Sequence, residues 1–255
     1  MSKFPGSFPF FILILLLSSA VIPVCPVFAQ SDEPAEPDSV NSFEYHGYEA
    51  VVGVTMRAQA LMLYSGSGNE KRAVMTGRFV PSPQIFINTP FRPFSVEEVM
   101  GEKVVRTGYY WKVSYNKFSL DRQEDPDTGG IGPASPVYDY GTRVKGEFLA
   151  VAPVIAHETL RPDGSVPFRV ELGLGIGYLD LAGDIVVGDW EGDPLAPKTK
   201  IDHRGMSAFI FMMGRHQWRS LMFGYQMSIS ISSGESYTYN QSYVCLDFGY
   251  KINWN

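Results

Sequence analysis

Near its C terminus the chain alternates strictly between apolar and polar residues over 244–254. The residues between the apolar ones are small or polar, apart from the thiol of Cys245. Successive side chains of a β-strand point to opposite faces, so this stretch predicts a strand with one apolar and one polar face. Its apolar positions are Val244, Leu246, Phe248, Tyr250, Ile252 and Trp254.

The same alternation recurs along the chain and predicts eight strands in all. Each is long enough to cross a bilayer at a tilt, which takes about 9–11 residues, although two of them only marginally so. The tetrapeptide 214–217 is predicted to be a tight turn. The expected strands are 47–64, 71–80, 105–117, 143–157, 168–180, 204–213, 218–233 and 244–254.

The N-terminal region is typical of an exported protein. Lys3 precedes the apolar run 8–20, and Val27, Phe28 and Ala29 form a small-residue cleavage site. We therefore predict a signal peptide over 1–29, a disordered acidic tether over 30–43 and a single β-domain over 44–255. An N-terminal helical anchor is the alternative. Removal of Lys3 would change the formal net charge of -6 to -7, which argues against a nucleic-acid partner.

The number and connections of these strands resemble a known class of membrane protein. Eight strands place both chain ends on one side, with long polar connections at 121–141 and 188–202 on the other. From Tyr45 to Trp254 the pattern resembles the OmpA/OmpX/OmpW type of small Gram-negative outer-membrane barrel, which usually ends on an aromatic residue; here Asn255 follows Trp254. The resemblance implies an all-β, eight-stranded antiparallel transmembrane up-and-down barrel. It also implies a monomer in contact with outer-membrane lipid, whose long loops meet an extracellular ligand or surface.

A soluble, lipocalin-like periplasmic barrel would show the same alternation with the faces reversed. Its outer surface would then consist largely of Gly and Ser with few charges, which is unusual for a soluble protein. The charged content of 19% is also low for a soluble domain. We therefore expect the apolar face to point outward.

An eight-stranded barrel has an interior just wide enough for side chains to fill. The polar faces would place charges of both signs inside, where unpaired charges are costly, so we predict a paired, structural plug rather than a gated path for protons or solutes. Its predicted members are Glu49, Arg57, Arg78, Arg106, Lys112, Arg169, Glu171, Asp247 and Lys251.

Two segments do not fit simple strands. Pro81 and Pro83 cannot donate to a ladder, so the second strand either stops before them or continues through a bulge into 84–88. Ser95 and Glu98 have the spacing of a capping box and suggest a short helix, but the course of 81–103 stays open. In 143–157, Pro153 and apolar residues on both faces indicate a bulge or a thick packed patch inside the barrel.

The sequence predicts no catalytic residue, no cofactor and no metal site. His46 and His216 fall at strand ends or turns, and His157 could pair with Glu158. Only His203, with Asp202 and Ser207 nearby, resembles a nucleophilic site. The outer-membrane lipid A deacylases place His and Ser two residues apart on one strand face, and here the separation is four.

The acidic loop residues are predicted to be solvated rather than calcium-binding. They are Asp121, Glu124, Asp125 and Asp127.

We therefore expect a non-enzymatic outer-membrane protein with a structural or surface-interaction role. A lipid-modifying outer-membrane enzyme and a narrow channel for small or apolar solutes remain as alternatives.

Overall fold

The computed structural model describes residues 47–65, 70–99, 103–124, 137–161, 166–188, 193 and 195–254. The predicted signal peptide and tether lie outside these residues. The chain separates into two units, Met1–Ser42 and Phe43–Asn255, and the second holds all the strands described below. Within the described residues there is no helix with the length and apolarity needed to cross a membrane.

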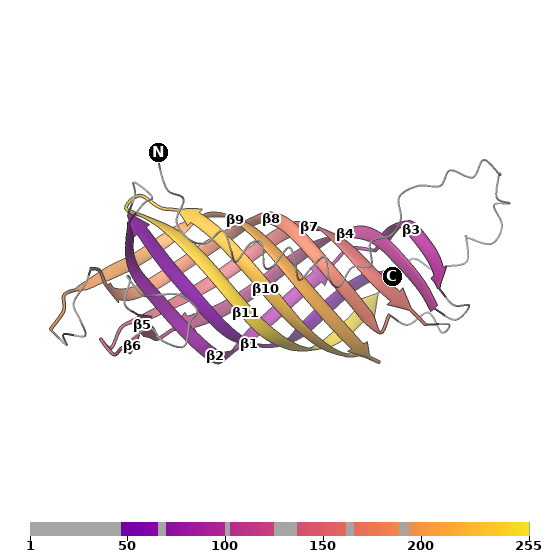
Figure 1. Ribbon diagram of the computed structural model, residues 1–255, viewed down its shortest axis with the longest axis horizontal. Coiled ribbons are helices and arrows are strands. Elements are labelled where there is room, and N and C mark those ends of the chain that lie inside the picture. Colours follow the sequence, from indigo (N-terminus) through magenta and orange to yellow (C-terminus); the bar gives the residue numbers. More distant parts are fainter. Residues whose placement is uncertain are drawn as a thin grey trace. The chain divides into compact units, whose positions relative to one another are not determined.

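The described residues form eleven strands, which Figure 1 labels in chain order. They are β1 (Tyr48–Ser65), β2 (Lys71–Asn88), β3 (Arg92–Val99), β4 (Lys103–Leu120), β5 (Arg122–Glu124), β6 (Val137–Tyr138), β7 (Arg143–Leu160), β8 (Phe168–Val186), β9 (Lys198–Trp218), β10 (Leu221–Ser233) and β11 (Tyr237–Trp254).

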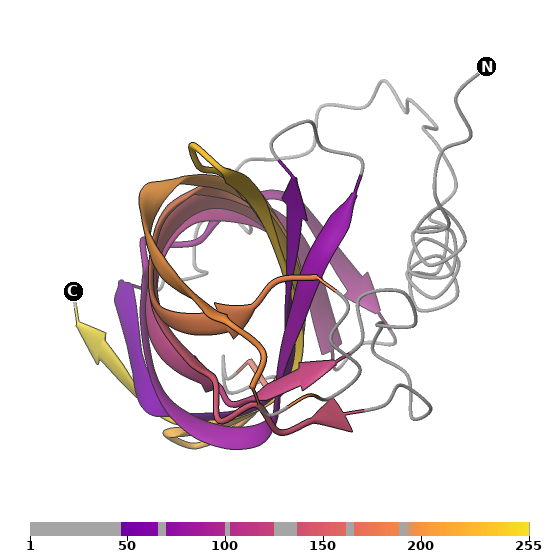
Figure 2. The ribbon, with the colours of Figure 1, turned by 90° about the vertical axis from the view of Figure 1, so that its left-hand side faces the viewer.

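Eight of these strands close into an antiparallel up-and-down ring. The ring runs β4-β7-β8-β9-β10-β11-β1-β2, and pairing of β2 with β4 closes it, as the end-on view in Figure 2 shows. β1 and β11 pair along their whole length, from Tyr48↔Trp254 to Ser65↔Tyr237. We call the end of the barrel at Tyr48 and Trp254 the terminal end, and the end at Ser65 and Tyr237 the far end. The predicted fold is confirmed.

Every predicted strand overlaps a strand of the ring, and several strands are longer than predicted. The predicted strand 218–233 instead starts too early, because β10 begins only at Leu221. β9 runs through the predicted turn 214–217 to Trp218, and the chain turns instead at Arg219, which has a left-handed φ of 55°. The predicted loop 188–202 is shortened because β9 already begins at Lys198. In the loop 121–141, β5 and β6 form a small hairpin that pairs with β2 at the far end.

The second strand continues through its two prolines. The register of β2 against β1 shifts by one residue between Val80 and Arg78, so Phe79 is the extra residue of a bulge. The helix suggested by Ser95 and Glu98 is wrong. Residues 92–99 form β3, which pairs with the terminal end of β4, where β4 extends beyond its pairing with β2. An available strand edge outweighs a local capping signal there.

β7 contains no bulge, because its register against β4 and against β8 does not shift. The ladder to β8 is interrupted only at Ala152 and Pro153 and resumes in the same register at Val154. Pro153 faces outward. The inward face carries the small residues Ala150, Ala152, Val154 and Ala156, which belong to the apolar core. Of the two predicted alternatives, the packed interior patch is therefore correct.

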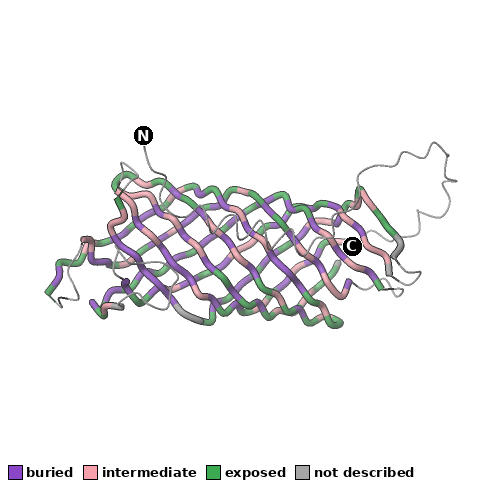
Figure 3. Tube along the Cα trace, viewed as in Figure 1, coloured by how far each residue is buried: buried purple, intermediate pink, exposed green. Residues whose placement is uncertain are grey.

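Burial alternates residue by residue around the barrel, as Figure 3 shows. The outward positions are the apolar ones; Leu174, Met206 and Ile176 are 65%, 60% and 56% exposed. This is the opposite of the lipocalin-like arrangement. The outward apolar residues also include Val52, Val54, Ile85, Tyr109, Trp111, Val113, Leu149, Ile155, Leu172, Tyr178, Phe223, Tyr225, Ile231, Leu246, Phe248 and Tyr250.

The apolar band has the height of a membrane-spanning surface. Across β4, β7 and β8 the outward residues form rows, and the rows from Tyr109 to Tyr115 are apolar or aromatic. The polar residues that border them, Thr107 and Lys117, lie ten positions apart on β4. At ~3.4 Å per residue and a tilt of about 40°, that is a rise of roughly 26 Å, close to the ~25 Å apolar band of outer-membrane barrels.

Candidate functional site: the lumen and the seam between β2 and β4

The terminal end of the lumen holds a network of charged side chains. Glu49 on β1 accepts hydrogen bonds from Arg215 Nη1 and from Asn88 Nδ2, each at 2.7 Å. Lys251 Nζ lies 3.2 Å and Arg169 Nη1 3.6 Å from the same carboxylate. Glu49 therefore connects β1 to β2, β8, β9 and β11.

Two further carboxylates, Glu158 and Glu171, complete this network. Glu158 pairs with Arg106 and accepts a 2.7 Å hydrogen bond from Arg169 Nε. Glu171 pairs with Lys112 and Arg215. All these side chains are buried, which is tolerable because each charge has a partner of opposite sign.

The described network contains three carboxylates and five cations. Aromatic rings stabilise some of the excess cations through cation–π contacts. Lys112 Nζ lies 4.5 Å from the centre of the Phe86 ring, and Arg215 lies 5.3 Å from the same ring. Arg169 lies 5.5 Å from the ring of Tyr110. Cation–π attraction is stronger in such desolvated surroundings than in water.

Six of the nine predicted plug residues meet in this network. They are Glu49, Arg106, Lys112, Arg169, Glu171 and Lys251. The prediction missed Arg215, which it placed in a turn, and Glu158, which it paired with His157. Continuing the alternation of β9 two residues beyond Met213 would have found Arg215.

The other three predicted plug residues lie elsewhere. Arg57 sits deeper in the lumen, where its Nη1 donates to Asn116 Oδ1 at 2.8 Å and its guanidinium lies over Tyr243. Asp247 accepts from Cys245 Sγ at 3.4 Å. Arg78 lies in β2 next to the bulge, and its side chain is outside the described residues.

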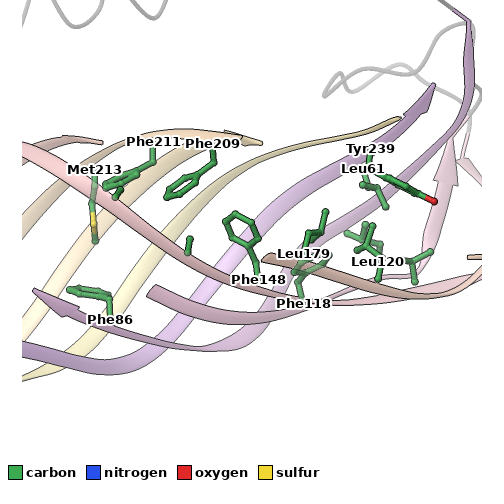
Figure 4. Packing of buried hydrophobic residues seen from close by; sticks show 14 of the residues in the cluster. Leu61, Phe86, Phe118, Leu120, Phe148, Leu179, Phe209, Phe211, Met213 and Tyr239 are labelled. Carbon is green, nitrogen blue, oxygen red and sulfur yellow. The ribbon is translucent and has the colours of Figure 1, made fainter. Parts of the chain in front are cut away.

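Between the charged network and the far end the lumen is filled by a cluster of apolar side chains (Figure 4) together with buried polar ones such as Gln59, Asn116 and Gln226. Phe148 meets Phe209 edge-on at 5.5 Å, and Phe209 stacks on Phe211 at 5.9 Å. The internal cavity lined by Phe86, Lys112 and these rings measures only about 10 Å³, about enough for a single water. A side-chain-filled lumen is therefore present, but more of its filling is apolar than the sequence predicted.

The predicted grouping of His203 with Asp202 and Ser207 does not form. Asp202 is exposed, and Ser207 Oγ donates to the carbonyl of Ile231 at 3.0 Å. His203 instead lies inside the lumen, with Nε2 2.8 Å from Ser232 Oγ and its ring stacked on Tyr239 at 4.2 Å.

The hydrogen bonds of Ser232 oppose a nucleophilic role. Its hydroxyl donates to the carbonyl of Met206 at 2.8 Å, so its single proton is committed there. His203 Nε2 is then the donor to Ser232 Oγ rather than a base that removes its proton. The remaining described histidines also have structural contacts. His157 Nδ1 meets Thr107 Oγ1 at 3.0 Å, and its neighbour Glu158 faces the lumen instead; His216 lies against Phe168.

The wall of the barrel is incomplete at one place, which we call the seam. β2 pairs with β4 only from Gln84↔Asn116 to Asn88↔Lys112, and then with β5 from Thr76↔Arg122 to Val74↔Glu124. Pro81 and Pro83 lie in the intervening stretch, where no ladder to β4 exists for their missing N–H groups to disrupt.

An outward groove of about 410 Å³ lies at the seam. Its apolar part includes Pro81, Pro83, Phe118 and Ala182. Its charged and polar part comprises Lys117, Ser119, Arg143, Lys145, Glu147 and Asp180.

The acids of this groove have partners, whereas two of its cations have no carboxylate partner among the described residues. Glu147 binds Lys117 Nζ at 2.7 Å and Tyr115 Oη at 2.8 Å. Asp180 lies 3.4 Å from Arg204 Nε. Arg143 Nε donates only to the hydroxyl of Ser119, at 3.0 Å, and Lys145 forms no ion pair with a described residue.

No group of three or more His, Cys, Asp or Glu side chains that could hold a metal ion occurs within the described ranges. Glu124, which was predicted to be a solvated loop residue, is instead buried and accepts a 3.1 Å hydrogen bond from Thr76 Oγ1.

No family model and no curated protein matches the chain. Its fold is similar to that of Neisserial surface protein A, with 12% identity, coverage of 83% of this chain and 99% of that chain, and a TM-score of 0.39. It is also similar to the outer membrane protein OprG from Pseudomonas aeruginosa (11% identity, 82% and 98% coverage, TM-score 0.38). A third similar structure is Ail, the attachment invasion locus protein of Yersinia pestis (10% identity, 81% and 99% coverage, TM-score 0.35). As the sequence predicted, the chain resembles the small Gram-negative outer-membrane β-barrels in fold.

Proposed function

We propose that this protein is a non-enzymatic integral protein of the Gram-negative outer membrane, whose closed barrel serves as a platform for its far end. The observation that carries the proposal is a side-chain-filled, ion-paired lumen inside a barrel with an apolar outer band. Such a barrel is stable in lipid and offers no wide path through it. Its role is then structural, or lies in surface contacts at the far end.

The location is supported by the outer band and by the predicted export signal. An apolar outer surface as tall as a membrane would be unfavourable in water, and it is stabilised by contact with lipid. A heat-shift gel tests this step: the mature chain, refolded in detergent, should migrate differently before and after boiling, because a closed ladder has no free edge from which to unfold. A chain that stays soluble without detergent and shows no shift would contradict the proposal.

The far end is built as a connected surface rather than as separate loops. Tyr138 and Tyr140 pack with Val186 and Ala196, which joins the two long connections. Gln123 side-chain atoms bond both the N–H and the carbonyl of Val186, and Lys198 Nζ donates to the carbonyl of Gly141 at 3.3 Å. We propose that this cap, formed by 122–124, 137–142, 186–188 and 195–198, is the part that meets an extracellular ligand or surface.

The channel alternative is tested by inserting the refolded barrel into planar bilayers. Because side chains fill the described lumen and the cavity beside Phe86 and Lys112 measures only about 10 Å³, the wild-type barrel should give no stepwise conductance. The Lys112→Ala/Phe211→Ala variant removes two lining side chains and serves as a positive comparison. Discrete conductance steps from wild-type protein, at the same frequency as from the variant, would favour the narrow channel.

A lipid-modifying enzyme is the second candidate, favoured by the contact between His203 and Ser232. Mass spectrometry of lipid A from a strain that overexpresses the protein tests it. We expect an unchanged acylation pattern. A lost or gained acyl chain that disappears with Ser232→Ala would establish catalysis and overturn the non-enzymatic proposal.

A further inference from the structure

We propose that the groove at the seam binds a phosphate group of lipid A, the phosphorylated glycolipid of the outer leaflet. The inference rests on the proposed outer-membrane location, with the far end outside the cell. It also depends on three features of the groove: its depth in the barrel wall, its free cations and its shape.

The groove begins where the apolar band ends. Tyr115, Leu149 and Tyr178 form one row across β4, β7 and β8. The next row toward the far end is charged, with Lys117, Glu147 and Asp180. Tyrosines mark the level of a membrane interface, so the charged rows lie at the depth of lipid headgroups.

The free cations of the groove match a phosphate. Arg143 and Lys145 lie two residues apart on the outward face of β7, so their Cα atoms are roughly 7 Å apart. Both are exposed, and the acids that line the groove already bind Lys117, Tyr115 and Arg204. Asp184 lies opposite Arg143 on β8, outside the groove lining, and forms no ion pair with it. A guanidinium and an ammonium together can donate several charge-assisted hydrogen bonds to one phosphate.

The shape of the groove also suits a lipid. The missing ladder between β2 and β4 leaves a recess of about 410 Å³, within the range of small-molecule sites. Pro81 and Pro83 line it with rigid apolar surface that offers no N–H donor, and Phe118 and Ala182 add apolar contact. A phosphate at the charged side would place the apolar part of the same lipid against this surface.

The test measures binding of diphosphoryl lipid A to the refolded barrel in detergent by native mass spectrometry. We expect Arg143→Glu/Lys145→Glu to weaken binding at least about tenfold, because two charge-assisted contacts are replaced by repulsion. The matched control is Arg161→Glu/Lys200→Glu, which makes the same charge change on one exposed arginine and one exposed lysine outside the groove. It should stay within about twofold of wild type, since no phosphate contact is removed.

Three results would overturn the inference: unchanged binding by the groove variant, an equal loss in the control variant, or equal binding of dephosphorylated lipid A. Phosphatidylglycerol binding as tightly as lipid A would overturn the choice of lipid. The heat-shift gel is run on every sample. If wild type shows no shift, the membrane proposal fails; if only the glutamate variant fails to fold, Arg143→Gln/Lys145→Gln takes its place and should lose about tenfold as well.

Discussion

The wall between β8 and β9 and the seam between β2 and β4 close the same barrel in different ways. The β8–β9 ladder runs without a register shift from Phe168↔His216 to Val186↔Lys198. The β2–β4 ladder covers only 84–88 on β2, after which β2 pairs with β5 instead. The wall excludes prolines from its paired stretch, while the seam contains two.

This difference shows that a closed barrel needs a continuous ring but not a continuous ladder at every height. The seam is also held from inside the lumen. Lys112, at the edge of the short β2–β4 ladder, pairs with Glu171 on β8, and Arg57 on β1 bonds Asn116 on β4. Side chains that span the lumen therefore stabilise the part of the ring in which backbone hydrogen bonds are fewest.

The largest effect is expected from a proline placed in the wall. At Ile176, β8 is paired on both sides, with Val151 of β7 and Ala208 of β9, so the lost N–H leaves a carbonyl unpaired whichever way it points. An unsatisfied backbone group in lipid costs on the order of several kcal/mol. Ile176→Pro should therefore abolish the heat shift in most of the refolded protein.

Ile176→Ala is the control for this prediction, because it shortens the same outward side chain and keeps the N–H. It should retain the heat shift. If Ile176→Pro folds as well as the alanine variant, folding does not require an uninterrupted β8–β9 ladder, just as it does not require one between β2 and β4.

The second-largest effect is expected from the lumen network. Glu171→Gln removes the carboxylate that Lys112 and Arg215 share, leaving buried cations with too few partners. Breaking a buried pair from one side costs about 3–5 kcal/mol. The free energy of unfolding, measured by urea titration in lipid vesicles, should fall by about that amount.

The exposed pair between Lys117 and Glu147 provides the matched comparison, since both side chains are about half exposed. Glu147→Gln should leave the unfolding midpoint unchanged, because water already solvates this pair. Equal losses in the two variants would mean that the lumen charges do not clamp the seam.

The sequence predicted the strands and most of the network because both follow from alternation within one strand. Glu49, Lys112 and Glu171 could be predicted to face the lumen because each occupies a polar, inward-facing position of its alternating strand. Glu158 and Arg215 were missed only because the strands that carry them were drawn too short. These errors concern element ends, where local pattern is weakest.

The seam and the groove could not be predicted from the sequence, for a different reason. The groove joins Pro81 of β2 with Lys117 of β4 and Lys145 of β7, and these meet only through the register between strands. The contact of His203 with Ser232 likewise depends on how β9 pairs with β10. The β3 strand replaced a predicted helix because β4 offered it a free edge. Register and edge availability are properties of the assembled sheet.

A smaller effect is expected from packing next to the seam. A Cβ atom on Gly146 of β7 would lie 2.1 Å from Phe118 Cζ of β4, so the ring would have to move. Overpacking of this kind costs about 1–3 kcal/mol. Gly146→Ala should lower the urea midpoint, whereas Gly224→Ala on β10, whose nearest atom would be 3.1 Å away, should lower it less. The reverse order would show that Phe118 is free to move into the seam.

The smallest effect is expected from restoring the two missing donors. Pro81→Ala/Pro83→Ala gives β2 the N–H groups that a ladder to β4 would need, but no ladder lies opposite them. The remaining change is in the unfolded chain, which gains freedom when prolines are removed, at about 0.4–1 kcal/mol for each site. The free energy of unfolding should therefore fall slightly. A rise would mean that β2 and β4 pair once their donors are present, so that the prolines themselves keep the seam open. Amide hydrogen exchange of 117–120 distinguishes the two cases, because newly paired amides would exchange more slowly than in wild type.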